Sequence, residues 1–247
     1  MANYTDRDVA VIIPARLSST RLPEKCLLQL GKYNLIQRVF LKAREAFPRV
    51  IVACDDLRIK KSVEDIDGTA VLTPADCRSG TDRVAVVAKD LTERLIVNVQ
   101  GDEPFINPAV IRKAVEPFFS DQSLEMGTIA TQVKVGKAAV NHNQVKVVLD
   151  QSGNALYFSR NLIPFPRDSA DVETLAHIGL YVYNRNFLLE FAGWPEGKLE
   201  SLEKLEQLRV LERGHRIRVV VTEYQGFGID TMEDYRKALE IIVKEKL

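Results

Sequence analysis

Cationic and hydroxyl side chains gather directly after the first long apolar run of the sequence. The run Val9–Ile13 predicts a strand buried on both faces, as in a parallel sheet. Arg16, Arg21 and Lys25 follow it, with three small hydroxyl residues at positions 18 to 20. Because ligands of open α/β sheets bind at the carboxyl ends of strands, and loop N–H groups cradle anions, this stretch predicts a phosphate-binding loop. It contains neither of the common glycine-rich phosphate motifs, so an ordinary solvated loop is the alternative.

Two aspartates are candidate ligands of a metal ion. Asp102 follows Gly101 at the end of the apolar run Leu95–Val99, and Asp230 stands just before the last helical pattern. Nucleotide phosphates usually arrive with Mg²⁺, which proteins bind through only one or two carboxylates. The alternatives are a turn at Asp102 and a helix N-cap at Asp230.

The segment Arg78–Arg83 stands at the start of a predicted helix. Ser79 and Gly80 occupy its first positions, where free N–H groups can bind an anion or the edge of a base. A well-capped helix without a ligand is the alternative.

A further group of residues could bind a polyhydroxylated acid. Arg160 ends a strand-like run and could hold a carboxylate. His177 and Tyr181 are four residues apart on one side of a predicted strand. Glu206 follows Leu202 by four residues, which places it beside the apolar stripe of a predicted helix, where a carboxylate meets a ligand or a salt bridge. A structural histidine and a core tyrosine are the alternatives for the first pair.

These residues belong to a pattern of alternating strands and helices. Strands are predicted at 9–13, 49–54, 69–72, 95–99, 126–135, 144–149, 155–159, 176–183 and 217–223, and helices at 35–47, 57–64, 80–91, 107–119, 199–213 and from 231 onward. Up to about residue 120 the alternation predicts βαβ units and a parallel sheet. The part at about 124–185 predicts antiparallel strands with a hairpin. We therefore expect an α/β fold with a mixed, mostly parallel sheet flanked by helices, as a single domain over 1–247 with an inserted antiparallel part at about 124–185.

Composition narrows the class of protein. Lys plus Arg and Asp plus Glu are equal at 34 each, and the zero net charge argues against a broad surface for nucleic acid. No apolar run approaches the ~20 residues of a membrane span. The first residues lack a signal-peptide core, so we expect a cytoplasmic protein without membrane insertion. The three cysteines, Cys26, Cys54 and Cys77, form no Cys-x-x-Cys pair, which is typical of a reduced compartment.

Six motifs, in this order along the chain, resemble one family closely. They are VIIPARxxSTRLPxK at 11–25, RSGTDR at 78–83, NVQGDEP at 98–104, VKVVLD at 145–150, ALYFSR at 155–160 and LEQLR at 205–209. Together they resemble the 3-deoxy-manno-octulosonate (Kdo) cytidylyltransferases, also called CMP-Kdo synthetases. The resemblance extends from about residue 9 to residue 236, and six motifs in register are far more specific than any one of them.

The resemblance implies a Rossmann-like, GT-A-like nucleotidyltransferase fold in which the inserted part helps to form a homodimer. It implies that CTP and Kdo give CMP-Kdo and diphosphate for lipopolysaccharide biosynthesis, with Mg²⁺ as cofactor. The anomeric hydroxyl of Kdo would attack the α-phosphate of CTP in line, and the enzyme would contribute positioning and charge neutralisation.

The resemblance also implies residue roles. By position, the nucleotide-binding set is Ala15, Arg16, Arg21, Lys25, Arg78, Ser79 and Gly80, of which Arg16, Arg21 and Lys25 would hold the triphosphate and the others would frame the cytosine. The metal ligands would be Asp102 and Asp230. The sugar-binding set would be Gln100, Arg160, His177, Tyr181, Glu206 and Gln207. The catalytic group would be Arg16, Lys25, Asp102 and Asp230.

Three positions depart from the usual pattern of the family. Glu24 and Cys26 replace the common Gly and Pro around Lys25, and Cys54 stands where Thr is usual. Glu24 puts a carboxylate beside the phosphate-binding lysine, which bears on the geometry of the loop and on the affinity for CTP. Cys26 and Cys54 are most simply small buried hydrophobic residues.

Three other functions remain to be compared with this one. The motifs do not separate Kdo from its 8-amino analogue as the sugar acid. An enzyme for sialic acid or for a UDP-sugar is disfavoured by the sequence at 15–25 and 205–209. A non-catalytic nucleotide-binding protein would be expected to have lost a metal carboxylate or Lys25, whereas Asp102, Asp230 and Lys25 are all present.

Overall fold

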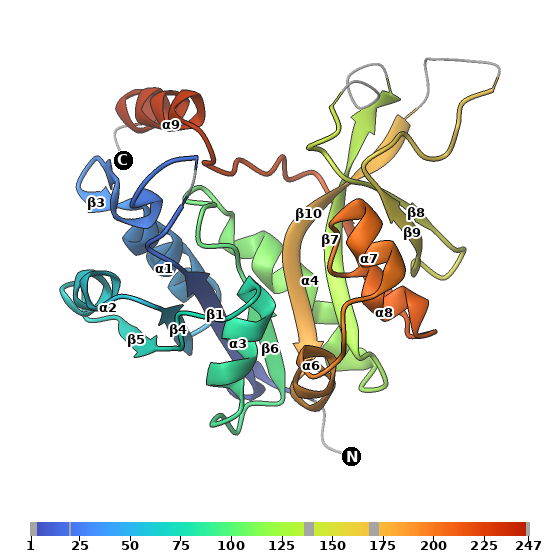
Figure 1. The fold of residues 1–247 in the computed structure, drawn as a ribbon, viewed down its shortest axis with the longest axis horizontal. Coiled ribbons are helices and arrows are strands. Elements are labelled where there is room, and N and C mark those ends of the chain that lie inside the picture. Colours follow the sequence, from blue (N-terminus) through green and yellow to red (C-terminus); the bar gives the residue numbers. More distant parts are fainter. Residues whose placement is uncertain (1–3, 20, 136–140, 168–172, 246–247) are drawn as a thin grey trace. The chain divides into compact units, whose positions relative to one another are not determined.

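The computed structural model describes residues 4–19, 21–135, 141–167 and 173–245, and the chain forms two compact units (Figure 1). One unit contains Tyr4–Arg112 and Gly226–Leu247 and is called here the parallel unit. The other, Lys113–Gln225, is called the mixed unit. The predicted antiparallel part at about 124–185 lies within the mixed unit, and its description as an insertion into one domain stays a prediction. Position 20 of the predicted phosphate loop lies outside the described residues.

The parallel unit is built on parallel strands in the order β6-β1-β4-β5. They are β1 (Val9–Ala15), β4 (Val50–Cys54), β5 (Thr69–Leu72) and β6 (Leu95–Asn98), beside a short antiparallel ribbon of β2 (Gln29–Leu30) and β3 (Tyr33–Asn34). β1, β4 and β6 are buried along almost their whole length, because helices cover both faces of the sheet. The continuous apolar runs of the sequence therefore predicted these strands correctly.

The helices of this unit explain where a ligand can bind. They are α1 (Leu35–Ala46), α2 (Leu57–Glu64), α3 (Gly80–Ala88), α9 (Met232–Glu245) and the beginning of α4 (Pro108–Ser120), together with the 3₁₀ turns η1 (Asp6–Asp8) and η2 (Lys25–Leu27). Because parallel crossovers are right-handed, α1 and α2, which lead from β1 outward to β5, cover one face, and α3, which leads back to β6, covers the other (Figure 1). The strand order reverses between β1 and β6, and ligands of such sheets bind beyond the carboxyl ends at this switch point. Within the described residues, none of the helices has the length and apolar character needed to span a membrane.

The beginning of α9 excludes one of the two alternatives for Asp230, that of a helix N-cap. Thr231 Oγ1 accepts a hydrogen bond from the N–H of Asp234 at 3.2 Å, and the Asp234 carboxylate accepts one from the N–H of Thr231 at 2.9 Å. This capping box was predicted from the sequence. Thr231 is thus the cap of the last helix, so the alternative of Asp230 as a plain N-cap is wrong and its carboxylate stays available for the cavity.

The mixed unit holds the predicted antiparallel strands. Its elements are β7 (Met126–Lys134), β8 (Lys146–Leu149), β9 (Ala155–Ser159), β10 (Glu173–Asn184), α6 (Arg185–Ala192), α7 (Lys198–Glu203), α8 (Leu208–Glu212) and β11 (Ile217–Thr222). β10 pairs antiparallel with β7 and β8, β8 and β9 form the predicted hairpin, and β11 runs parallel to β7. The sequence analysis did not predict α6.

One predicted helix is wrong. The sequence predicts continuous helix over Leu199–Arg213, whereas the chain forms α7 and α8, separated at Lys204, whose φ is +53°. The reason is a competing hydrogen-bond donor. The guanidinium of Arg160 donates to the carbonyl oxygens of Glu203, at 2.7 Å, and Lys204, at 3.3 Å, which a continuous helix would use internally.

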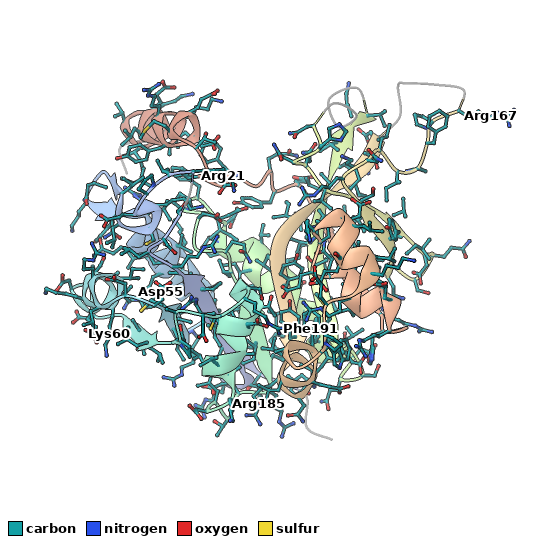
Figure 2. The ribbon with its side chains drawn as sticks, viewed as in Figure 1. Arg21, Asp55, Lys60, Arg167, Arg185 and Phe191 are labelled. Atoms are coloured by element: carbon teal, nitrogen blue, oxygen red, sulfur yellow. The ribbon has the colours of Figure 1, made fainter. Side chains whose placement is uncertain are left out.

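A buried ion pair joins α7 to α8. Arg209 donates from Nε and Nη2 to the two carboxylate oxygens of Glu200, at 2.7 and 2.6 Å, and both side chains are about nine-tenths buried. The Arg209 guanidinium also lies over the ring of Phe191, 4.8 Å from its centroid. Figure 2 labels Phe191, which belongs to α6. Removing one partner of such a pair leaves an uncompensated buried charge.

We therefore expect Glu200→Gln to lower the free energy of unfolding by about 3 kcal/mol. Urea denaturation followed by circular dichroism measures the change. The matched control is Glu233→Gln in α9, which removes an exposed pair with Lys237 and should cost less than about 1 kcal/mol. Equal losses in the two variants would contradict the assigned role of burial.

Candidate active site

A cavity of about 400 Å³ lies at the carboxyl ends of β1 and β6 in the parallel unit. Every residue predicted to bind the nucleotide lines it: Ala15, Arg16, Arg21, Lys25, Arg78, Ser79 and Gly80. Gln100, Asp102 and Asp230, predicted for the sugar and the metal, line the same cavity. The fold thus brings together residues that lie more than 200 positions apart in the sequence.

The loop after β1 is tied to the end of β4. The N–H of Leu17 donates to Asp55 Oδ1 at 2.9 Å, and the buried guanidinium of Arg83 lies 3.3 Å from Asp55 Oδ2. Arg83 also donates to the hydroxyl of Thr73 at 2.5 Å. The sequence analysis assigned no role to Asp55 or Arg83. The available signals were the position of Asp55 directly after an apolar strand and that of Arg83 at the end of the RSGTDR motif.

Two carboxylates converge on one ammonium group inside the cavity. Lys25 Nζ lies 2.8 Å from Asp102 Oδ2 and 2.9 Å from Asp230 Oδ1. Arg21 approaches the same Asp230 oxygen at 3.1 Å. Burial opposes the charged form of Lys25, but the two carboxylates outweigh it and raise the pKa of this lysine above its ordinary value. With two cations and two anions, the cluster has no net charge.

Gly101 allows Asp102 to reach this position. A Cβ atom at Gly101 would lie 2.7 Å from the carbonyl oxygen of Pro14, closer than real Cβ contacts. The turn after β6 can therefore approach the end of β1 only with glycine here. The N–H of Ile229 donates to the carbonyl of Asp102 at 3.0 Å, which brings the segment that carries Asp230 alongside.

The donor set of this cluster fits a magnesium ion. Carboxylate oxygens are the ligands that Mg²⁺ prefers, and it commonly uses one or two of them together with phosphate oxygens and water. The described residues contain no group of three or more His, Cys, Asp or Glu side chains that could hold a metal. A metal ion at this cluster would therefore depend on Asp102, Asp230 and oxygens of the nucleotide.

The start of α3 forms another wall of the cavity. Ser79 Oγ accepts from the N–H of Asp82 at 3.1 Å, so the alternative of a well-capped helix is correct as far as this residue goes. Ser79 and Gly80 nevertheless line the cavity. A Cβ atom at Gly80 would lie 3.4 Å from Pro14 Cγ, so a small residue lets α3 begin close to β1. Arg78 pairs with Asp82 at 2.9 Å.

The carboxylate of Glu24 binds an arginine of α2. Glu24 has a left-handed backbone, with φ +51°, and is the N-cap that directly precedes η2. Its carboxylate lies 2.7 Å from the guanidinium of Arg58, which also pairs with Asp56 at 3.0 Å. Lys25, the next residue, bonds to Asp102 and Asp230 instead. The loop geometry around the lysine is therefore compatible with a carboxylate at position 24.

The cysteines behave as the sequence suggested. Cys26 and Cys54 are almost completely buried, and all three cysteines are free. Burial raises the pKa of the Cys26 thiol to about 12 and that of Cys54 to about 11. Cys77 lines the cavity with Cys26, and burial also raises its pKa.

Three residues predicted for the sugar lie together in the mixed unit. The rings of His177 and Tyr181 are 5.5 Å apart, and Tyr181 Oη donates to Gln207 Oε1 at 3.3 Å. The amide nitrogen of Gln207 is buried and has no hydrogen-bond partner among the described residues, and such a donor favours a ligand acceptor. Loss of solvation on burial disfavours the charged form of each side chain. It lowers the pKa of His177 to about 3 and raises the pKa of Tyr181, so both side chains are neutral.

Arg160, also predicted for the sugar, belongs to the mixed unit, and main-chain carbonyl oxygens hold its guanidinium. Its guanidinium donates to the carbonyls of Glu203, Lys204 and His142, at 2.7, 3.3 and 3.3 Å. No carboxylate of the described residues forms an ion pair with it. The Glu203 carboxylate instead accepts from the N–H of Arg160 and from the hydroxyl of Ser159, at 2.9 and 2.7 Å.

The remaining two sugar candidates have protein partners. Glu206 lies 3.5 Å from the guanidinium of Arg209, so the salt bridge left open by the sequence analysis is present. Its expected place beside an apolar stripe is wrong, because Leu202 is 73% exposed and the helix is interrupted between the two residues. Gln100 belongs to the parallel unit, lines its cavity and donates to Asn98 Oδ1 at 3.3 Å.

An enzyme that transfers a nucleotidyl group needs cationic side chains for the phosphates and carboxylates for a divalent cation in the same site. The cavity of the parallel unit contains both, so the fold and the site define this chain as a nucleotidyltransferase. A family model described as "Cytidylyltransferase" matches residues 10–217. A protein of Trichlorobacter lovleyi named 3-deoxy-manno-octulosonate cytidylyltransferase is 48% identical over 94% of this chain and 97% of its own length. The chain belongs to the 3-deoxy-manno-octulosonate cytidylyltransferase family.

Two further comparisons support the assignment. A protein of the same name from Solibacter usitatus is 47% identical over 94% of this chain and 93% of its own length. The solved structure of a CMP:2-keto-3-deoxy-manno-octonic acid synthetase complexed with CTP superposes with a TM-score of 0.92 and 34% identity, over 96% of this chain and 99% of that one. The likeness confirms the expected fold class. It also supports a nucleotide as substrate, with which enzymes of this class use a divalent metal ion.

Glu24→Gly tests whether the unusual carboxylate affects the nucleotide site. Glycine removes the left-handed strain, worth about 1 kcal/mol, and loses an exposed ion pair worth at most about 1 kcal/mol. We therefore expect the KM for the nucleotide to stay within about twofold and the melting temperature within a few degrees of wild type. Glu24→Ala, which keeps the strain and loses the pair, is the control and should melt lower. A tenfold change in KM for the glycine variant would mean that Glu24 contributes to nucleotide binding.

Proposed function

We propose that this chain activates Kdo by transferring the cytidylyl group of CTP to the anomeric hydroxyl of the sugar acid, with release of pyrophosphate. The observation that carries the proposal is the convergence of Asp102 and Asp230 on the ammonium of Lys25 in the switch-point cavity. The names of relatives at 48% and 47% identity support the choice of CTP and Kdo.

The nucleotide would occupy the cavity of the parallel unit. Arg16, Arg21 and Lys25 would hold the triphosphate, because they are cationic side chains of one loop that line one cavity. Ala15, Arg78, Ser79 and Gly80 would frame the cytosine, where the first turn of α3 offers N–H groups.

We assign Mg²⁺ to Asp102 and Asp230. When bound there, it would neutralise phosphate charge and lower the pKa of the attacking hydroxyl, so that no separate protein base is required. The ammonium of Lys25 now lies between the same carboxylates, 2.8 and 2.9 Å away. The phosphates would offer new acceptors to Lys25 and to Arg21, which also lies 3.1 Å from Asp230. If both cations moved to the phosphates, both carboxylates would be free for the metal.

The sugar acid is assigned to Gln100, Arg160, His177, Tyr181, Glu206 and Gln207. Arg160 suits the carboxylate, since it has carbonyl partners and no anionic one among the described residues. The unpartnered amide nitrogen of Gln207 suits a hydroxyl oxygen. His177 is neutral at physiological pH and would position the sugar by hydrogen bonding without acting as an acid.

The chain's own residues would act mainly by position and charge. The anomeric oxygen would form a bond to the α-phosphorus while the bond from that phosphorus to the bridging oxygen breaks. Pyrophosphate would leave with the electron pair, and the proton of the anomeric hydroxyl would pass to solvent water. Lys25 and Arg21 would neutralise the charge that develops on the leaving group, and Arg16 would hold the phosphate chain in line. We further propose a cytoplasmic homodimer that serves lipopolysaccharide biosynthesis, as the resemblance implies.

A pyrophosphate-release assay tests the reaction. Purified protein with Mg²⁺ is given CTP, UTP or ATP, each with Kdo, its 8-amino analogue or sialic acid. We expect release with CTP and Kdo alone, because the matching family model is described as a cytidylyltransferase and the similar protein of Trichlorobacter lovleyi is named a 3-deoxy-manno-octulosonate cytidylyltransferase. Preference for the amino sugar would change the substrate and keep the mechanism. No release with any pair from folded protein would refute catalysis and leave a nucleotide-binding protein.

Lys25→Met tests the metal site without catalysis. Removing the ammonium from between the two carboxylates should raise the affinity for Mn²⁺ in the absence of nucleotide by about tenfold or more. The metal ion then meets Asp102 without a cationic partner and Asp230 with only Arg21 beside it. Electron paramagnetic resonance of free Mn²⁺ measures the affinity. The control is Lys25→Met with Asp102→Asn, which should lose the added affinity. Unchanged Mn²⁺ binding in the single variant would argue against a metal at these carboxylates.

A further inference from the structure

Lys146 is a fully buried lysine that the roles proposed so far do not use. It opens β8 in the mixed unit, opposite Ser159 of β9, and has no exposed surface. Its ammonium donates to the carbonyl oxygens of Gln144, at 2.8 Å, Asn141, at 3.3 Å, and Arg160. No carboxylate of the residues described in this unit lies within ion-pair distance of it.

A buried ammonium without a paired carboxylate is costly. Desolvation disfavours the charged form and lowers the pKa of Lys146, although the nearby charge of Glu203 opposes this effect. Three carbonyl oxygens satisfy the three N–H donors of the ammonium, which explains how the charge is tolerated. Methionine would fill the same volume without that cost, so packing alone does not account for a lysine here.

The three carbonyl oxygens that Lys146 binds belong to segments that hold Arg160 in place. One belongs to Arg160 itself, so Lys146 holds the main chain of that residue. The other two flank His142, whose carbonyl accepts from the Arg160 guanidinium at 3.3 Å. Lys146 therefore holds both the backbone of Arg160 and the loop that supplies one acceptor for its side chain.

The charges around Arg160 do not balance. Lys146 and Arg160 carry two positive charges, and Glu203 carries one negative charge, with its oxygens bound to Ser159 Oγ and the N–H of Arg160. Among the described residues, the guanidinium is bonded to carbonyl oxygens and to no carboxylate. One positive charge is thus left in excess, which suits a ligand that carries one carboxylate.

We propose that Lys146 is a positioning residue for Arg160 and supplies the positive excess with which the mixed unit binds the carboxylate of the sugar acid. This inference rests on the proposed role of Arg160. It assigns Lys146 no contact with the substrate, only an effect on the orientation and charge of the residue that makes the contact.

A double-mutant cycle tests this inference. KM for Kdo, KM for CTP and kcat are measured for wild type, Lys146→Met, Arg160→Ala and the double variant. We expect Lys146→Met to raise KM for Kdo about tenfold, with KM for CTP within about twofold. In the Arg160→Ala background, Lys146→Met should raise KM for Kdo by less than about a further twofold, because the guanidinium that Lys146 positions is already absent.

The control is Thr174→Val. Thr174 is buried in the same unit and donates to the carbonyl of Ile163 at 2.7 Å, so this variant also loses a buried donor to a main-chain oxygen. It should lower the melting temperature without a selective change in KM for Kdo. Should Lys146→Met not fold, Lys146→Gln removes the charge and keeps a donor. In unaltered protein, the ¹⁵Nζ resonance of Lys146 should shift with Kdo and stay in place with CTP.

The possible results separate the two claims. An unchanged KM for Kdo in the folded Lys146 variant, equal rises in both KM values, or a full additional loss in the Arg160→Ala background would each overturn the inference. An unmoved ¹⁵Nζ resonance with Kdo would do the same if neither variant folds. An unchanged KM for Kdo in Arg160→Ala itself would instead refute the proposed carboxylate role of Arg160.

Discussion

The contact of one lysine with two carboxylates is the interaction on which the proposed nucleotide site depends. Lys25 comes from the loop after β1, Asp102 from the turn after β6 and Asp230 from the segment before α9. The three side chains meet only because β1 and β6 are neighbours at the point where the strand order reverses. The close approach at Gly101 and the hydrogen bond from Ile229 to Asp102 then set their spacing.

The two units differ in how they balance charge, and the difference suits the two proposed substrates. In the parallel unit, Lys25 and Arg21 are matched by Asp102 and Asp230, so a polyanion and a divalent cation could enter together by exchanging partners. In the mixed unit, Arg160 is held by neutral carbonyl oxygens and keeps its charge for a single carboxylate. The proposed metal-bound triphosphate and the proposed sugar acid would thus meet different electrostatic surroundings in one chain.

Much of the parallel unit could be predicted from the sequence, because buried parallel strands are continuous apolar runs and their carboxyl ends share one edge. That rule was enough to group Arg16, Lys25 and Asp102 by their positions after apolar runs, and all three line the cavity. It could not supply Asp55 and Arg83, whose roles depend on hydrogen bonds between distant segments. It also could not predict the break at Lys204, since the helical pattern there is overridden by donors from Arg160.

The contacts of the mixed unit were harder to predict from the sequence, because they too join distant segments. His177 and Tyr181 were correctly placed on one side of a strand, because alternation along a strand is a local property. The contact of Tyr181 with Gln207 joins two elements whose spacing depends on the tertiary fold. Lys146 belongs to the VKVVLD motif, but its burial could not be predicted, since a lysine inside an apolar strand pattern is normally expected to face solvent.

The cysteines of the nucleotide cavity have a practical consequence. Cys26 and Cys77 line it, yet burial keeps both thiols protonated at neutral pH, and it is the thiolate that attacks electrophiles and oxidants. The cavity therefore contains two thiol groups, neither of which is a thiolate nucleophile at neutral pH. Reagents that inactivate enzymes through cysteine thiolates should therefore react slowly with these two thiols.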